Sequence, residues 1–144
     1  MPLILWGADI PPDVLIDTPV STASLPSTIL SLAGIANDPF PTPSLRPLIY
    51  ADVPPADWPQ PISEVAQFAG SAEENPTTHG EMKSVVGEQM QYIIHEKFGV
   101  ELYTWHDDPQ EVNNLVDDPS VMDVLDSFKL FLTNLIGDPI FKTP

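Results

Sequence analysis

The sequence predicts an α+β fold, in which a strand and a helix are followed by a small antiparallel sheet of three or four strands and a long C-terminal helix. Two patterns carry this prediction. Three consecutive extended segments between residues 82 and 105 predict antiparallel strands. After them, an apolar stripe with three-four spacing predicts a helix that packs on the sheet.

The start of the chain predicts one strand and one helix. Leu3–Trp6 is an apolar run ended by Gly7, which is typical of a strand buried on both faces. Residues 21–33 predict a helix that Ser21 or Ser24 can cap and a following glycine can end. The face expected to be buried is formed by Leu25, Ile29, Leu32 and Ala33.

Residues 36–80 are rich in proline and predict a connecting segment. Residues 49–51 predict either a brief strand or the end of a helix. The stretch 52–61 holds four prolines and Trp58, which we interpret as an aromatic plug over a core edge rather than a ligand-stacking residue. Ile62–Phe68 predicts a short strand that carries Glu64, and residues 69–80 a polar loop.

The sheet itself is predicted from residue 82 onward. Residues 82–86 and 90–96 predict a hairpin around Gly87–Glu88. A second turn at Phe98–Gly99 leads into a strand over residues 101–105. The sequence after this strand predicts the start of a helix, because Asp108 can cap it, Pro109 suits a first turn and Glu111 holds the reciprocal capping position.

The last helix has the clearest periodicity. Asp118 is placed to cap it, Pro119 to open it and Gly137 to end it. Its apolar stripe consists of Val121, Val124, Leu125, Phe128, Phe131, Leu132 and Leu135. We expect this stripe to pack on the sheet.

Composition restricts the partners. The chain has 144 residues, 42% of them hydrophobic, which is enough for a folded core. The net charge of −16 disfavours nucleic acid and anionic membranes as partners, and it repels a sulfate or phosphate ester unless a cation reverses the field. There is no cysteine, no apolar run approaches the ~20 residues of a membrane span, and the first residues lack signal-peptide features, so no localisation is indicated.

Three segments resemble the sulfatase family of the alkaline phosphatase superfamily. The segment 101–115 is similar to the family pattern ELYDLxxDPxExxNL, with Thr104-Trp105 in place of the usual Asp-Leu. Residues in register there are Glu101, Leu102, Tyr103, Asp108, Pro109, Glu111, Asn114 and Leu115. The stretch 2–35 resembles VPLIxWGPGIPxGxxxDxPVSxxDLxPTxLxLAGI through residues such as Trp6, Gly7, Asp17, Pro19 and Gly34. Residues 82–93 resemble MRSVRxGxxKYI, with Gln91 in place of the usual Lys.

This resemblance implies an organisation and a function. Residues 1–50 would be the end of a sulfatase-like α/β catalytic domain, 51–81 a proline-rich connection and loop, and 82–144 a C-terminal subdomain of antiparallel sheet plus helix. The intact relative would hydrolyse sulfate esters, with phosphate or phosphonate esters as the less favoured choice. It would use calcium or a similar divalent cation and a formylglycine, neither of which is expected from residues of this chain.

The chemistry that such an enzyme needs is missing from the sequence. A dianionic transition state requires concentrated positive charge and an activated nucleophile. The sequence contains no Cys/Ser-x-Pro-x-Arg motif and no Asp-His-Gly or Asp-Asn-Gly step. We therefore expect no catalytic residue and no metal ligand here. His79 with Lys83 is the one candidate substrate-binding pair, weighed against a solvated loop histidine and an edge-strand lysine.

The remaining polar candidates have structural interpretations. His95 and His106 are expected to be exposed residues at strand ends. The pairs Asp107–Asp108 and Asp117–Asp118 lack EF-hand spacing and are interpreted as helix caps.

Two function hypotheses from different classes remain. The chain is either a C-terminal sulfatase fragment, inactive alone, or a stand-alone acidic module for binding or assembly. The first predicts a partner, either a missing N-terminal catalytic half or a second copy that pairs through the first strand's edge. The substrate and the oligomeric state are open at this point.

Overall fold

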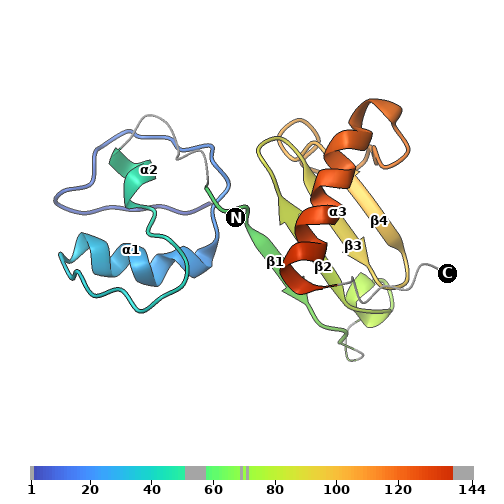
Figure 1. Cartoon of the computed structure of the whole chain (residues 1–144), viewed down its shortest axis with the longest axis horizontal. Coiled ribbons are helices and arrows are strands. Elements are labelled where there is room, and N and C mark those ends of the chain that lie inside the picture. Colours follow the sequence, from blue (N-terminus) through green and yellow to red (C-terminus); the bar gives the residue numbers. More distant parts are fainter. Residues whose placement is uncertain (1, 51–57, 69, 71, 138–144) are drawn as a thin grey trace. The chain divides into compact units, whose positions relative to one another are not determined.

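The computed structural model describes residues 2–50, 58–68, 70 and 72–137. The chain divides into two compact units, unit 1 (residues 1–59) and unit 2 (residues 60–144) (Figure 1).

Unit 1 contains two helices. A short 3-10 turn, η1 (Thr22–Ser24), runs into α1 (Leu25–Leu32), and α2 (Arg46–Tyr50) follows. Ser21 Oγ accepts the N–H of Ala23 at 3.2 Å, and Gly34 takes a φ of 73° just after the helix. The predicted helix, its cap and its terminating glycine are therefore confirmed. Of the two alternatives for residues 49–51, a helix end is found at residues 49 and 50, and residue 51 lies outside the described residues.

The buried face of α1 differs from the predicted one. Ser27 and Thr28 are buried, whereas Ile29 is 65% exposed. The Thr28 hydroxyl donates to the carbonyl of Ser24 at 2.6 Å and accepts the N–H of Leu45 at 2.8 Å, and Ser27 Oγ donates to the carbonyl of Thr42 at 2.7 Å. Small hydroxyl side chains can be buried because each finds a backbone partner. The predicted apolar face was wrong because segment 42–49 packs on the hydroxyl side of the helix.

The predicted strand at Leu3–Trp6 is also wrong. Residues 2–6 form no strand, and Ile4 and Trp6 are 86% and 96% exposed. A strand buried on both faces needs a hydrogen-bonded neighbour on each side, and the described residues of unit 1 include no strand.

Unit 2 is built on a four-stranded antiparallel sheet. Its strands, in the order β1-β2-β3-β4, are β1 (Ile62–Val65), β2 (Met82–Val86), β3 (Gln91–His95) and β4 (Gly99–Tyr103). The register places Val85 opposite Ile62 on one side and Tyr92 on the other, and Tyr92 opposite Leu102. The predicted antiparallel sheet is confirmed in its four-stranded form. β4 begins two residues earlier than predicted, at Gly99, whose φ is 84°.

The C-terminal helix is confirmed with its signals. Asp118 Oδ1 accepts the backbone N–H and the hydroxyl of Ser120, each at 2.8 Å, and these hydrogen bonds lower the pKa of the Asp118 carboxyl. Pro119 opens the 3-10 turn η3 (Pro119–Val121), which runs into α3 (Met122–Ile136), and Gly137 ends the helix with a φ of 81°.

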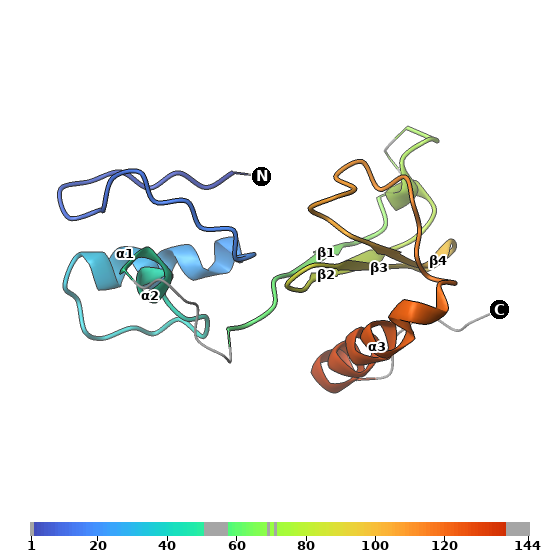
Figure 2. The same ribbon diagram turned by 90° about the horizontal axis from the view of Figure 1, so that it is seen from above.

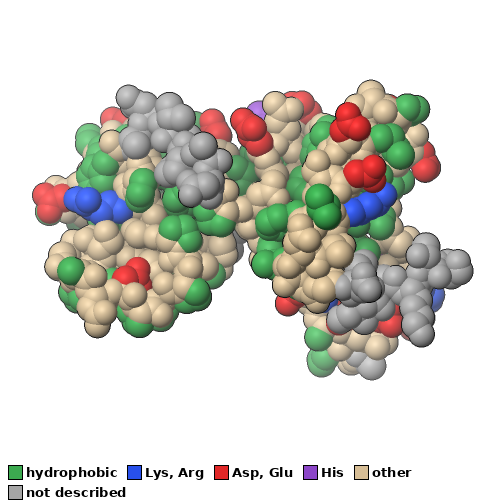
Figure 3. All heavy atoms as spheres, in the orientation of Figure 1, with side chains coloured by type: hydrophobic (Ala, Val, Ile, Leu, Met, Phe, Trp, Pro, Cys, Tyr) green, Lys and Arg blue, Asp and Glu red, His purple; other side chains and the backbone are tan. Residues whose placement is uncertain are grey.

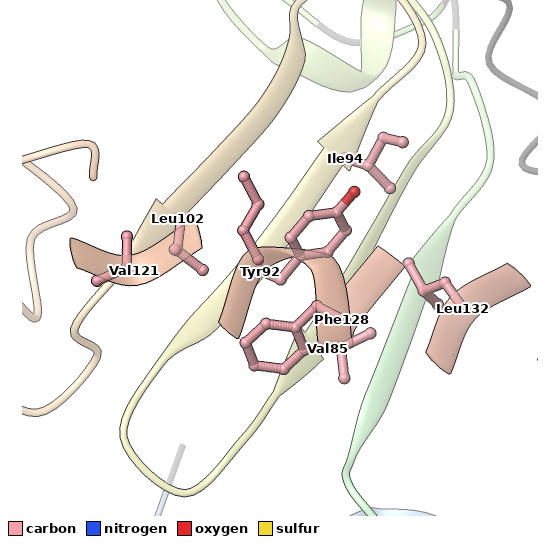
Figure 4. Packing of buried hydrophobic residues seen from close by; sticks show 8 residues of the cluster. Val85, Tyr92, Ile94, Leu102, Val121, Phe128 and Leu132 are labelled. Atoms are coloured by element: carbon pink, nitrogen blue, oxygen red, sulfur yellow. The ribbon is translucent and has the colours of Figure 1, made fainter. Parts of the chain in front are cut away.

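The helix α3 covers one face of the sheet (Figure 2). Tyr92 stacks on Phe128 with ring centroids 5.7 Å apart, and burial raises the pKa of the Tyr92 phenol. Figure 4 shows the core side chains meeting between sheet and helix. The core consists of Val85, Tyr92, Ile94, Leu102, Val121, Leu125, Phe128 and Leu132. The buried stripe is narrower than predicted, since Val124 and Leu135 are exposed.

Gly87 lets the β2–β3 turn approach α3 closely. A Cβ at this position would lie 2.8 Å from Phe128 Cζ, inside the contact distance of two carbons. The carbonyl of Gly87 also accepts the indole N–H of Trp105 at 3.1 Å. The turn is thus fixed between the helix and the loop that follows β4.

The segment 104–118 is a loop, and the helix predicted to start at Asp108 is wrong. The Asp108 carboxylate accepts the N–H groups of Val112 at 3.1 Å and Asn113 at 2.8 Å. Glu111 has a φ of 55°, in the left-handed region that a helix excludes. The carboxylate therefore stabilises a turn in place of a helix.

The same loop closes the edge of β4. Asn114 Oδ1 accepts the N–H of Leu102 at 3.0 Å and that of Val116 at 3.1 Å. The N–H of Leu115 donates to the carbonyl of Leu102 at 2.8 Å. These bonds satisfy edge groups that would otherwise be unpaired.

The described residues include no helix of the length and apolarity that a membrane span requires.

Candidate functional site

Four side chains with polar or aromatic groups gather where the β1–β2 connection meets the β3–β4 turn. We call them the histidine cluster: His79, His95, Lys97 and Phe98. The Phe98 ring contacts both imidazoles, and its centroid lies 5.5 Å from that of His79 and 4.6 Å from that of His95. The 3-10 turn η2 (Pro76–Thr78), capped by Asn75, carries His79 at its end.

His95 is buried, which corrects the prediction that it is an exposed strand-end residue. It is only 4% exposed. Its Nδ1 accepts the backbone N–H groups of Lys97 at 3.0 Å and Phe98 at 3.2 Å. The ring proton is therefore on Nε2, which donates to the carbonyl of Pro76 at 2.8 Å. Alternation along β3 points His95 away from α3, toward the side of the sheet on which the η2 turn lies (Figure 2).

His79 contacts a cation that the sequence prediction missed. Its Nε2 lies 2.9 Å from the carbonyl of Glu73, and its Nδ1 lies 3.3 Å from Lys97 Nζ. Because Lys97 can only donate, Nδ1 is the acceptor and Nε2 the donor. The register could have identified this contact: Met82 pairs with His95, so the residues just before β2 lie beside those just after β3.

Lys83 lies on β2, between β1 and β3, so the predicted edge-strand position is wrong. It is 7% exposed, and its Nζ lies 3.6 Å from carboxylate oxygens of both Glu64 and Glu81. Glu81 Oε1 is itself buried, and it has this ion pair instead of a hydrogen bond. Two carboxylates thus balance the charge that was expected to face an anion. The substrate-binding role of His79 and Lys83 stays a prediction.

His106 is largely exposed, with its Nδ1 3.6 Å from Asp107, which agrees with its predicted position.

The surroundings of the loop 104–118 are acidic. Burial and the carboxylates of Glu101, Glu111 and Asp108 raise the pKa of the Tyr103 phenol. Figure 3 shows that acidic side chains are spread over the visible face and that basic ones cover little of it. Together with the net charge of −16, this distribution disfavours an anionic ligand on the visible face.

The described residues do not fit a divalent cation of the kind that sulfatases use. Within residues 2–50, 58–68, 70 and 72–137, no three His, Cys, Asp or Glu side chains come together as a ligand set. Asp108 uses both carboxylate oxygens, and Asp118 uses Oδ1, to accept backbone N–H groups. Asp118 is the cap that the sequence predicted, whereas Asp108 stabilises the loop.

No family model and no curated protein matches the chain. Solved structures, in contrast, match the fold of the chain. A Bacteroides thetaiotaomicron protein assigned as a sulfatase superposes with a TM-score of 0.57 and 25% identity, over 76% of this chain and 23% of that one. A 2-O GAG sulfatase gives a TM-score of 0.56 at 25% identity, with the same coverage of both chains. The phosphonate monoester hydrolase of Agrobacterium radiobacter gives 0.53 at 16% identity, over 82% of this chain and 28% of that one.

These comparisons define the class of the fold. It is sulfatase-like, and its structural neighbours are sulfatases and a phosphonate monoester hydrolase of the alkaline phosphatase superfamily. The matched part of the chain spans only about a quarter of the length of these proteins.

Proposed function

We propose that this chain is the C-terminal portion of a sulfatase-like hydrolase, whose intact form cleaves sulfate esters. One observation carries the proposal: the chain shares its fold with sulfatases over 76% of its own length, but over only 23% of theirs. In this account, unit 2 is the C-terminal sheet-and-helix subdomain and unit 1 is the edge of the catalytic domain.

The surface of unit 1 supports this account. Ile4, Trp6 and Leu15 are each more than four-fifths exposed, although such side chains stabilise a protein only when they are buried. Apolar surface of this kind is typical of a contact with another protein part. We propose that the catalytic portion of the hydrolase covers these residues, either as preceding sequence or as a separately encoded half.

The charges of unit 2 support a role other than catalysis for the chain alone. Sulfate-ester cleavage needs concentrated positive charge and an activated nucleophile. Glu64 and Glu81 balance Lys83, and Asp126 pairs with Lys129 at 3.3 Å. Among the described lysines of unit 2, Lys97 beside His79 is the one for which no carboxylate lies within 4 Å. We therefore propose that His79 and Lys97, rather than His79 and Lys83, face any anionic substrate group.

An activity assay tests the non-catalytic part of the proposal. The purified chain is incubated with 4-nitrophenyl sulfate and with an aryl phosphonate, each in the presence of calcium and of magnesium. We expect no turnover above that of the Lys97→Ala variant, which controls for contaminating enzymes because it is purified identically. Turnover by the chain alone, lost in that variant, would contradict the proposal.

A second candidate is a stand-alone acidic module for binding or assembly. It is favoured by the closed core of unit 2, where Val85 and Leu102 are fully buried without help from another chain. The length of the natural polypeptide separates the two candidates.

A further inference from the structure

We propose that His95 forms an acid-sensitive clasp, in which its neutral imidazole joins the turn that carries His79 to the β3–β4 turn and protonation of the ring releases it. This inference stands apart from the proposed function, because it depends only on the hydrogen bonds inside unit 2. The clasp consists of the Asn75–His79 turn, the His95 ring and the Lys97–Phe98 backbone.

The hydrogen bonds of His95 require a neutral ring. Two backbone N–H groups, those of Lys97 and Phe98, donate to Nδ1 at 3.0 and 3.2 Å. A proton on Nδ1 would place a third N–H against these two donors. His95 is 4% exposed, so a protonated ring in this position would have no water to accept its Nδ1 proton. The ring therefore has to leave its site when it takes up the proton.

Leaving the site breaks the contact with the turn. His95 Nε2 donates a hydrogen bond to the carbonyl of Pro76 at 2.8 Å. This bond joins the His95 side chain to the η2 turn. Movement of the ring also removes its packing on Phe98, which in turn contacts His79. One protonation event thus loosens the position of His79.

The second histidine responds in the same direction. His79 Nδ1 accepts from Lys97 Nζ at 3.3 Å, so a protonated His79 would face an ammonium group. The other ring nitrogen of His79, Nε2, donates a hydrogen bond to the carbonyl of Glu73 and so links the two ends of the segment 73–79. Both imidazoles therefore use Nδ1 as a hydrogen-bond acceptor, and a proton on that nitrogen would break the bonds that it accepts.

The nearby carboxylates do not reverse this effect. Glu96 Oε2 accepts the N–H of Glu81 at 3.3 Å, and Glu81 Oε1 pairs with Lys83. Glu96 attracts a charged His95, but it cannot replace the two acceptor bonds that Nδ1 loses. The cross-strand neighbours of His95, Met82 on β2 and Gly99 on β4, carry no charge. The clasp is therefore closed while the His95 ring is neutral and opens when acid protonates the ring.

Amide hydrogen exchange of the full chain tests the clasp. The reporters are the N–H groups of Thr78 and His79, which donate to the carbonyls of Asn75 and Pro76. From about pH 7.5 to about pH 5.5, we expect their protection, corrected for intrinsic exchange, to fall about tenfold. Amides of β2 and β3 should keep their protection, which separates local opening from a general effect of carboxylate protonation.

The variant His95→Asn is the matched control. The Asn side-chain oxygen can accept the same backbone N–H groups as Nδ1, but it does not titrate in this range. We expect its turn amides to show a much smaller pH-dependent change, because only the response of His79 remains. Equal pH dependence in both proteins, or none in the wild type, would overturn the proposal. If the variant does not fold, nitrogen-15 spectra of wild-type His95 decide. The closed state should contain the Nε2–H tautomer, and a doubly protonated His95 ring in a protein whose turn amides keep their protection would refute the clasp.

Discussion

Phe128→Ala should lower the free energy of unfolding of unit 2 by about 3–5 kcal/mol. Phe128 is 5% exposed, stacks on Tyr92 and lies over the β2–β3 turn. Removal of the Phe128 ring leaves a cavity between α3 and the sheet. Gly87, which lies against the ring, has no side chain that could fill this cavity. Urea denaturation followed by the NMR signals of β2–β4 measures the change.

The control for this prediction is Leu130→Ala on the same helix. Leu130 is 62% exposed, so its truncation should change the free energy of unfolding by less than about 0.5 kcal/mol. Comparable losses from the two variants would mean that α3 does not pack on the sheet through Phe128.

Asn114→Ala should destabilise unit 2 by about 1–3 kcal/mol. The Asn114 side-chain oxygen accepts two backbone N–H groups, and that of Leu102 belongs to a residue with no exposed surface. Truncation leaves this N–H without an acceptor and frees the loop from the edge of β4. The measurement is urea denaturation together with exchange of the Leu102 amide, which should become much faster.

Two neighbouring substitutions sharpen the result. Asn114→Asp retains the accepting oxygen and should cost clearly less than Asn114→Ala. Asn113→Ala removes a side chain for which the structure gives no hydrogen bond and should be close to neutral, because the bond of Asn113 to Asp108 uses its backbone. A larger effect at residue 113 than at residue 114 would be incompatible with the observed loop.

Much of unit 2 follows from local sequence patterns. The stripe Val121-Leu125-Phe128-Leu132 has a helical period, and Asp118, Pro119 and Gly137 mark the ends of the helix, so α3 was predicted with its boundaries. The alternation in β2 and β3 also predicted their pairing. These elements depend on neighbours close in sequence, which is the information that a single sequence carries best.

The errors share a different cause, which is dependence on distant partners. Leu3–Trp6 has strand composition but no pairing strand among the described residues. Asp108 has the composition of a helix cap, yet Glu111 adopts a left-handed conformation and Asn114 draws the chain back to Leu102. Tertiary contacts decided both cases against local propensity.

The candidate site was predictable only in part. His79 was identified from the sequence, but its partner is Lys97, 18 residues away, rather than Lys83. His95 was expected to be exposed because it ends a strand, and it is buried because the η2 turn covers it. The pairing register of β2 and β3 places His79, His95 and Lys97 close together, whereas the composition of the sequence does not reveal this register.

The length of the natural polypeptide is the most direct test of the proposal that this chain belongs to a larger hydrolase. An antibody against unit 2 is used on extracts of cells that make the protein, and the captured polypeptide is sequenced by mass spectrometry. We expect a product several times heavier than 15.8 kDa, with a Cys/Ser-x-Pro-x-Arg motif in the sequence that precedes these residues. A product of 15.8 kDa alone, with no co-purifying half that carries this motif, would contradict the account.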